Sequence, residues 1–452
     1  MKTVKSLLLG AAAGFIGLTG AQAADLPGKA APAEYVRICD TYGAGFFFIP
    51  GTDTCLRIGG YVRHESYLAQ QFTPGTNVYS TRTRLLLNFD ARSNTEYGLL
   101  RAYGEFFVQR GPGGNALTGG LLNIASGQGS GVQASATYMS RAFIQFAGFT
   151  FGNSASFFNF YQGDVQFVTA AGSAFDPARG SSNLIAYTAS FGSGFSATVS
   201  VEDPQFKRIG ALGSISAAGV TAGPSQANGV VYNGNVIPDV VGNLRVDQGW
   251  GSAQVMAAYH EVRTTNAGGF NRTASGWAVG AGVRLNLDML ARGDVLWLQA
   301  AYGEGAIAYT AHQDNSDGLV QTRNAIGAGL VTGLYADGLL TATDRVALSK
   351  SWGIHAGFRH FWTPALRSAL WGKYVSIDAP GVAGAVGNNL NDIKFWQVGV
   401  NTIWSPVRNL DLGVEVVYSN LRSRDNGSGL TPVGSIGNAT AWSGMFRVQR
   451  NF

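Results

Sequence analysis

Arginines at alternate positions are the residues of the N-terminal third with the clearest chemical potential. In the stretch STRTRLLLNFDAR, residues 80–92, Arg82 and Arg84 occupy even positions, and Leu85, Leu87 and Phe89 occupy odd ones. A guanidinium group stays positively charged at any physiological pH, so a row of them attracts anions and repels cations. The pattern therefore predicts selection of solutes by charge.

Residue types that carry catalysis or hold metals form no recognisable set. The five histidines are scattered along the chain: His64, His260, His312, His355 and His360. Glycine stretches such as GPGG at 111–114 lack the strand-to-helix context and the lysine of a phosphate-binding loop. No spacing of His, Cys, Asp or Glu matches a metal site. We predict no enzyme activity, no cofactor and no metal site.

The alternation itself is the period of a β-strand, in which successive side chains point to opposite faces. Segments of about ten residues with this period recur along the chain, often with Trp or Tyr at their ends. They include segments near Leu56, Leu100, Ala136, Trp277, Trp352, Trp396 and Leu410. The alternation is poorly kept near 183–202 and 294–303. We count about sixteen candidate strands, an even number typical of bacterial membrane barrels.

The first 23 residues predict secretion. MKTVKSLLLGAAAGFIGLTGAQA has two lysines, an apolar stretch and a small-residue site ending at Ala23, as cleavable signal peptides do. Removing residues 1–23 takes away two of the 32 basic residues and none of the 27 acidic ones, which leaves a balance of +3. There is no dense Lys/Arg tract, so we predict no nucleic-acid partner.

Composition favours a membrane barrel. Charged residues make up 13% of the chain, against roughly 25% in a globular protein. The 63 glycines and 12% aromatic residues accompany a mean hydropathy of only +0.06. After the signal no apolar run reaches the length of about 18 residues that a spanning helix needs. An apolar outer face and a wet lumen average to such values. A soluble sandwich or propeller would carry more charge, and no blade repeat is visible.

Connections between the candidate strands alternate between short and long. Short ones lie at 94–98, 148–150 and 405–409, and long ones near 111–135, 161–182, 203–237, 304–348, 378–392 and 422–438. Such a succession predicts antiparallel hairpins with short periplasmic turns on one side of a membrane and long external loops on the other. We expect an all-β fold: a transmembrane antiparallel β-barrel over residues 55–452.

The two cysteines, Cys39 and Cys55, favour a disulfide, because a secreted chain matures in an oxidising compartment. A metal site is the weaker alternative, since two thiolates without nearby His or carboxylate partners are an incomplete zinc site. We expect residues 24–54 to form an N-terminal periplasmic segment whose disulfide loop lies near the base of the first strand.

Both ends of the chain resemble one family. The opening YVRICDTYGAGFFFIPGTDTCLR and the ending MFRVQRNF, which finishes on Phe452, are similar to those of the alphaproteobacterial outer-membrane general porins. The resemblance implies a sixteen-stranded barrel in the bacterial outer membrane, assembled as a homotrimer among outer-membrane lipid and lipopolysaccharide. It implies a water-filled channel for passive diffusion of small hydrophilic solutes. It also implies that the barrel-assembly machinery recognises the C-terminal strand through Phe452.

Strand parity then places a set of arginines on the lumen side of four consecutive strands, because a central arginine facing lipid costs about 2–4 kcal/mol. This predicted basic wall comprises Arg57, Arg63, Arg82, Arg84, Arg101 and Arg141. In porins a long loop folds into the lumen, and the matching segment is 161–182, with Asp164 and Asp176 as acidic counterparts. Opposed charges across a narrow lumen would orient dipolar solutes. Alternatively, individual arginines are ordinary lumen groups paired with Glu65, Asp90 or Glu105.

Two other functions stay open at this point. A sugar-specific channel would use lumen aromatics, and the residues with that parity are Tyr61, Tyr67, Tyr103 and Trp371. A plugged surface-interaction barrel would use its long loops, above all 304–348, as a binding surface.

Overall fold

The computed structural model describes residues 37–69, 78–112, 133–160, 167, 181–209, 214–216, 219–221, 232, 234, 236–265, 271–310, 335–341, 343–381, 391–425 and 437–452. The predicted signal peptide, residues 1–23, and the predicted loop residues Asp164 and Asp176 lie outside these ranges.

Within the described ranges, sixteen antiparallel strands form one closed barrel, as the sequence predicted. In chain order the strands are β2 (Cys55–Ala69), β3 (Tyr79–Thr95), β4 (Gly98–Pro112), β5 (Gln133–Phe146), β6 (Phe149–Ala155), β7 (Ser181–Gly192), β8 (Phe195–Glu202), β11 (Asp239–Gln248), β12 (Gly251–Thr265), β13 (Asn271–Asn286), β14 (Val295–Glu304), β17 (Lys350–Thr363), β18 (Leu366–Asp378), β19 (Asn391–Val407), β20 (Leu410–Asp425) and β21 (Gly437–Asn451). Each strand pairs with the next, and β21 pairs with β2.

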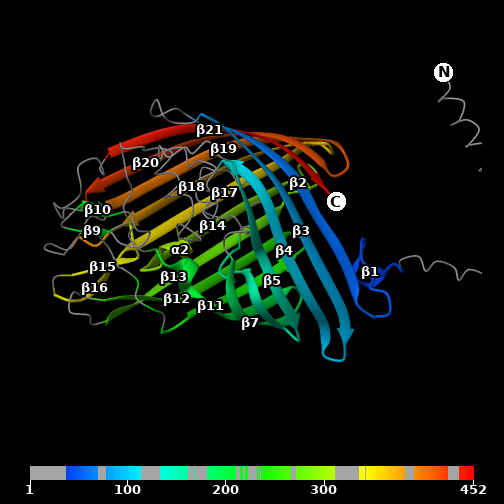
Figure 1. Ribbon diagram of the computed structural model, residues 1–452, viewed down its shortest axis with the longest axis horizontal. Coiled ribbons are helices and arrows are strands. Elements are labelled where there is room, and N and C mark those ends of the chain that lie inside the picture. The colour runs from blue at the N-terminus through cyan, green and yellow to red at the C-terminus, as the bar shows by residue number, and fades with distance from the viewer. Residues whose placement is uncertain are drawn as a thin grey trace, which may run out of the picture.

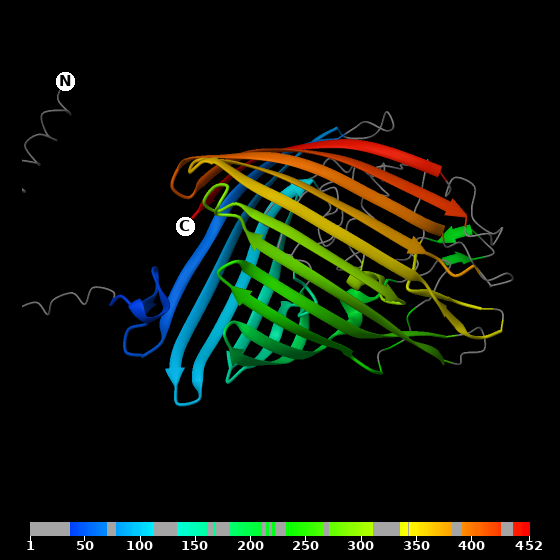
Figure 2. The ribbon, with the colours of Figure 1, turned by 180° about the vertical axis from the view of Figure 1, so that it is seen from behind.

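The two ends of the barrel carry different elements (Figures 1 and 2). Short strands that follow long connections lie at one end: β9 (Ser214–Ser216), β10 (Gly219–Thr221), β15 (Gly338–Leu340) and β16 (Val346–Leu348). The other end carries the tight turns, the C-terminus and β1 (Phe47–Phe48). The remaining short elements are the helical turns η2 (Asp40–Tyr42), η4 (Pro204–Lys207) and α2 (Ile307–Thr310).

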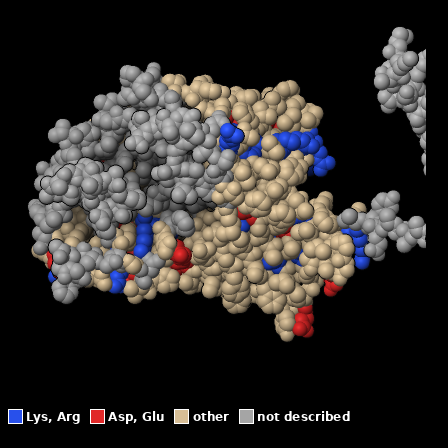
Figure 3. Space-filling view, viewed as in Figure 1, with Lys and Arg blue, Asp and Glu red and all other residues tan. Residues whose placement is uncertain are grey.

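Large apolar side chains cover the outside of the barrel. On β7, for example, Ile185 and Tyr187 are exposed on the outside. Leu184 and Ala186, which alternate with them, are buried on the lumen side. Uncharged residues dominate the face seen in Figure 3. This outer surface is what lipid requires of a barrel. No helix among the described residues has both the length and the apolar character needed to cross a membrane.

The segments in which the sequence pattern was weakest are nevertheless regular strands. Residues 183–202 form most of β7 and β8, and 294–303 form most of β14, with alternating burial along each. Their inward residues include apolar ones, such as Val295 and Trp297, which are buried because other chain segments pack on them inside the lumen. In these strands buried and exposed residues alternate, but apolar and polar residues do not.

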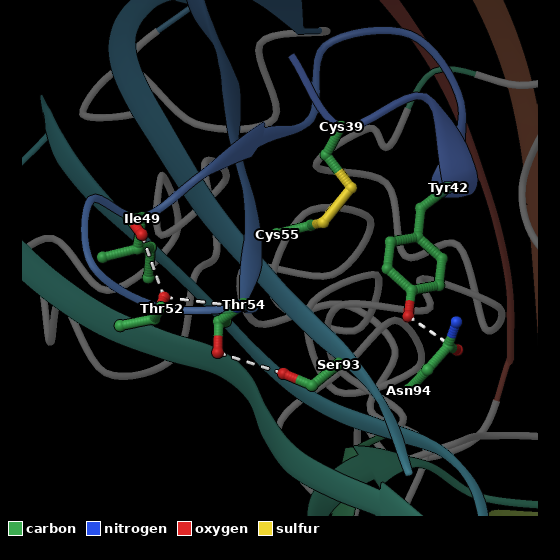
Figure 4. Close-up of a disulfide and its surroundings, with 8 residues drawn as sticks. All are labelled: Cys39, Tyr42, Ile49, Thr52, Thr54, Cys55, Ser93 and Asn94. Atoms are coloured by element: carbon green, nitrogen blue, oxygen red, sulfur yellow. Dashed lines mark hydrogen bonds between the residues drawn. A yellow bond between two sulfur atoms is a disulfide. The ribbon is translucent and has the colours of Figure 1, made fainter. Parts of the chain in front are cut away.

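The predicted disulfide between Cys39 and Cys55 is confirmed, with its Cα atoms 6.0 Å apart (Figure 4). Cys55 is the first residue of β2, and both cysteines are buried with Phe46. The hydroxyl of Tyr42 donates to Asn94 Oδ1 of β3 at 2.8 Å. The N-terminal loop is thus fastened to the ends of the first two barrel strands.

Barrel closure extends to the last residue of the chain. The backbone N–H of Phe452 donates to the carbonyl of Gly60 at 3.0 Å, and the N–H of Gly60 donates to the carbonyl of Phe452 at 3.2 Å. A side chain at position 60 would overlap the carbonyl of Leu86 on β3. Glycine therefore allows β2 and β3 to approach closely beside the C-terminus.

At the end with the long connections, one buried carboxylate joins several segments. Asp337, which is fully buried, accepts from the backbone N–H groups of Ile209 at 2.7 Å and Ile307 at 2.9 Å. It also accepts from the hydroxyl of Tyr232 at 2.5 Å, and His260 of β12 lies 3.9 Å away. Burial raises the pKa of Asp337 to about 6, although these donors and His260 oppose the shift.

Docking of these segments should therefore depend on pH. Because its pKa is raised above the ordinary value, Asp337 contributes stability that is fully present only below pH 3.8 and is lost as the pH rises through about 6. We expect hydrogen-exchange protection of the Ile209 and Ile307 amides to be greater at pH 5 than at pH 8, by up to about tenfold. The Asp337→Asn variant should lose this difference. Protection that instead increases with pH would contradict the assignment. The other charged groups facing the cluster are Asp239 and Arg208.

Candidate pore constriction

Four arginines and one glutamate gather on the lumen side of β21, β2 and β3, where the first and last strands meet. We call this group the basic strip; its members are Arg63, Glu65, Arg82, Arg84 and Arg447. Cross-strand pairing sets it out in two rows. In one row Arg63 lies directly opposite Arg84, and in the other Glu65 lies between Arg82 and Arg447.

Glu65 is the carboxylate at the centre of the strip, and it is fully buried. Arg447 donates to its Oε1 with Nη2 at 2.7 Å and with Nε at 3.0 Å. Arg82 donates to Oε2 with Nε at 2.7 Å, and Nη1 of Arg63 lies 3.7 Å from Oε1. The strip as defined thus holds four guanidinium groups and one carboxylate.

Arg63 and Arg84 are like charges directly opposite each other, an arrangement that destabilises a sheet unless other contacts compensate. Two glutamines provide part of that compensation. Arg63 Nε donates to Oε1 of Gln449 at 2.7 Å, and Arg84 Nη2 donates to Oε1 of Gln109 at 2.8 Å. In each case a neutral amide holds the guanidinium in place without adding a negative charge.

Aromatic rings support the same two guanidinium groups. Arg63 Cζ lies 4.3 Å from the ring centroid of Tyr61, and Arg84 Cζ lies 4.1 Å from that of Phe107. A cation over a ring face gains about 0.5–2 kcal/mol. Stacking also fixes the plane of each guanidinium and so orients its N–H groups.

The structure places the other predicted wall residues elsewhere. Arg101 shares Asp90 with Arg92, and its Nε lies 2.9 Å from Oδ1 of that carboxylate. Arg57 is exposed near the disulfide loop, with its Cζ 5.6 Å from the ring of Phe46. Strand parity gave the correct face for these residues but not their height along the barrel.

Arg141 lies on β5, where it pairs in register with Glu105 of β4. Of the six predicted arginines, Arg63, Arg82 and Arg84 therefore belong to the basic strip.

Arg447 is the member of the strip that sequence reasoning missed. In MFRVQRNF the outward residues are Phe446 and Val448, so parity already assigned Arg447 and Gln449 to the lumen. What the sequence could not supply was the pairing of β21 with β2, which brings Arg447 opposite a glutamate 382 residues away.

After β6 the chain leaves the wall and enters the barrel interior. The backbone N–H of Phe157 donates to Oε1 of Glu202 at 3.1 Å, and Nδ2 of Asn243 donates to the carbonyl of Phe157 at 2.7 Å. Phe160 packs edge-on against Trp297 of β14, with ring centroids 5.5 Å apart. Phe157 and Phe160 thus lie on the lumen side, against the wall formed by β8 to β14.

Four aromatic residues with lumen parity do not form an open stacking surface. Tyr67 and Trp371 are 3% and 2% exposed. The hydroxyl of Tyr103 donates to Glu105 at 2.8 Å, and Tyr61 is covered by the guanidinium of Arg63. These four side chains act as packing partners for charged groups. Within the described ranges there is also no group of three or more His, Cys, Asp or Glu residues placed to hold a metal ion.

A closed sixteen-stranded barrel with an apolar exterior and a charged interior defines a membrane channel. Residues 24–445 match the family described as Porin subfamily, and the chain belongs to this porin family. It is 34% identical over 312 residues to Porin Omp2b of Brucella abortus (strain 2308), a match that covers 67% of this chain and 75% of that protein. The match to Porin Omp2b of Brucella suis biovar 1 (strain 1330) has the same identity and coverage.

The fold is shared with a solved structure, the outer membrane channel DcaP of Acinetobacter baumannii. That likeness has a TM-score of 0.58 at 16% identity and covers 90% of this chain and 99% of the other. The protein is accordingly an outer-membrane channel for passive diffusion and not an enzyme.

Removing the central carboxylate should destabilise the barrel. In Glu65→Gln the guanidinium groups of Arg82 and Arg447 lose their buried counter-charge, which we expect to lower the free energy of unfolding by about 3 kcal/mol. The measurement is urea unfolding in detergent, followed by tryptophan fluorescence. The control is Asp247→Asn, which breaks the more exposed pair with Arg245 and should change stability by less than about 1 kcal/mol. Equal effects of the two variants would contradict this role of Glu65.

Proposed function

We propose that the basic strip forms one wall of a charged constriction through which small hydrophilic anions pass more readily than cations. The observation that carries the proposal is the direct opposition of Arg63 and Arg84 across β2 and β3, where Gln449 and Gln109 accept hydrogen bonds from them and aromatic rings stack on them. A porin needs no such pair for stability, since like charges in register oppose sheet formation. Features that break a local rule in this way are expected at functional sites.

The facing side of the constriction belongs, in this proposal, to the segment that follows β6. Its described residues Phe157 and Phe160 lie inside the barrel against the wall from β8 to β14, and its described residue Phe167 lies beside Arg447 of the basic strip. Asp164 and Asp176 of the same segment would supply the opposing charge. A field between the two sides would align dipolar solutes and disfavour apolar ones without any binding site.

A sugar-specific channel has less support than a charge-selective one. Sugar rings need exposed aromatic faces in the lumen, and Tyr61, Tyr67, Tyr103 and Trp371 are buried or occupied by charged neighbours.

Neutralising the opposed pair tests the proposed selectivity. A charge about 8 Å from a permeating ion contributes about 0.5 kcal/mol in water. Screening at 0.1 M salt roughly halves this energy, and each of the two charges both attracts the anion and repels the cation. The double variant Arg63→Gln/Arg84→Gln should therefore lower the ratio of chloride to potassium permeability by about fivefold. Reversal potentials across a salt gradient in planar bilayers measure this ratio. Arg101→Gln is the matched control, because Arg101 is already paired with Asp90. The proposal fails if the double variant and the control shift the potential equally.

The maturation and assembly that we propose follow the family pattern. Residues 1–23 are removed as a signal peptide, residues 24–54 lie in the periplasm, and residues 55–452 form the barrel of a homotrimer among outer-membrane lipid and lipopolysaccharide. The barrel-assembly machinery binds the last strand through Phe452, whose side chain is 55% exposed.

Deleting Phe452 tests the assembly step. We expect the deletion to lower the amount of folded trimer in the outer membrane, as measured by the unboiled band on gels, because it removes both the exposed ring and the backbone pairing with Gly60. Phe452→Tyr keeps both and should assemble normally. Normal trimer levels after the deletion would contradict this role.

A further inference from the structure

The segment that enters the lumen after β6 touches the barrel wall again at Phe167, far around the circumference. Phe167 is 2% exposed and contacts β20 and β21, whereas Phe160, seven positions earlier, contacts β13 and β14. We propose that Phe167 is an anchor that fixes the inward segment to the β20–β21 wall, and that Gly413 is the socket that receives it. Phe167 and its partners are positioning residues. The inference rests on the channel function and adds the residues that keep the lumen open.

The socket exists because position 413 has no side chain. Gly413 lies on the lumen face of β20, and a Cβ atom there would overlap Cζ of the Phe167 ring. The same Cβ would lie 3.2 Å from Cγ1 of Ile403 on β19, so this side chain would also have to shift. The ring of Phe167 thus occupies the space that any larger residue at position 413 would fill.

A backbone hydrogen bond holds the anchor from a second direction. The N–H of Phe167 donates to Oε2 of Glu415 at 2.8 Å. The same oxygen accepts from Nε1 of Trp371 at 3.1 Å and from Nδ2 of Asn401 at 3.0 Å. Glu415 is 1% exposed, and its position is therefore set by β18 and β19 as well as by its own strand. A carboxylate fixed by these donors offers Phe167 an acceptor at a defined place.

The anchor is also in contact with the basic strip. Cζ of Arg447 lies 4.3 Å from the ring centroid of Phe167, and the same guanidinium donates two hydrogen bonds to Glu65. Arg447 is thus shared between the charged wall and the inward segment. This contact fixes the distance between them at one point.

A similar arrangement occurs where the segment leaves β6. A Cβ atom at Gly282 of β13 would overlap the ring of Phe160, and Arg245 Cζ lies 5.4 Å from the centroid of that ring. Two phenylalanines of one segment therefore each lie between a glycine and an arginine on different parts of the wall. The repetition supports docking of aromatic rings into glycine sockets as the means of positioning.

Truncating the anchor should disturb the open current. Phe167 lies against the wall, so its release would bring the ring towards the lumen axis. Loss of the buried ring in Phe167→Ala should raise the released population on the order of 100-fold. Gly413→Ala should act in the same way by excluding the ring. In planar-bilayer recordings of the purified full-length protein, we expect both variants to show higher open-channel noise and brief partial closures.

Two comparisons separate this anchor from a general loss of stability. Gly444→Ala on the adjacent strand is the matched control, because a Cβ atom there meets no described atom closer than the carbonyl of Glu415 at 3.7 Å. The open-channel noise of Gly444→Ala should equal that of the wild type. The double variant Phe167→Ala/Gly413→Ala should be no noisier than Phe167→Ala alone, because both changes remove one contact. Glu415→Gln keeps an acceptor oxygen and should stay quiet, whereas Glu415→Ala should be noisy.

Quiet wild-type-like currents in Phe167→Ala, or additive noise in the double variant, would overturn the anchor. Noise in Gly444→Ala equal to that in Gly413→Ala would do the same. These outcomes are distinct from failure of the channel assignment, which would appear as absence of conductance in the wild type, and from failure of the charged constriction, which the Arg63 and Arg84 variants test by reversal potential.

Discussion

Closure of the sheet by β21 on β2 is the constraint on which the rest of the structure depends. In a bilayer no water satisfies the backbone groups of an open edge, so a β-sheet can span only as a closed barrel. Closure joins residues that are nearly the whole chain apart, as Phe452 with Gly60 and Arg447 with Glu65. The charged strip lies at this seam, so the lumen charge and the integrity of the barrel share residues.

The arginines of the strip are held partly by a carboxylate and partly by neutral amides. Glu65 neutralises one positive charge in the strip, and Gln109 and Gln449 hold the opposed pair without neutralising it. Elsewhere full pairing occurs, as where Asp90 binds both Arg92 and Arg101. Each cluster has one carboxylate: Asp90 is shared by two arginines, whereas Glu65 lies among the four arginines of the strip. Selectivity in this account follows from this larger number of arginines in the strip.

Sequence reasoning reached the fold, the outer face and the disulfide, because strand period, composition and cysteine number are local properties. Parity assigned Arg63, Arg82 and Arg84 to the lumen, and these residues meet. It assigned Arg57 and Arg101 to the same wall, but they lie with Phe46 and Asp90, since parity contains no information on height along the barrel. Arg447 needed knowledge of the closing register.

The contacts of Phe167 with Gly413 and Glu415 join residues almost 250 positions apart, and no local pattern could have revealed them. The same holds for β14. Trp297 faces the lumen, and an apolar side chain suits this position because Phe160 covers it. Where one segment folds inside another, hydropathy no longer distinguishes the wet face of a strand from the lipid face.

The most direct test of the account is the reversal potential of the wild-type channel in a planar bilayer across a potassium chloride gradient, repeated at rising mean salt concentration. Surface charge in a wet lumen is screened over about 10 Å at 0.1 M salt and about 3 Å at 1 M. The account requires anion preference at low salt that declines towards none at high salt. A cation preference, or a potential independent of mean salt, would contradict the basic strip as the source of selectivity.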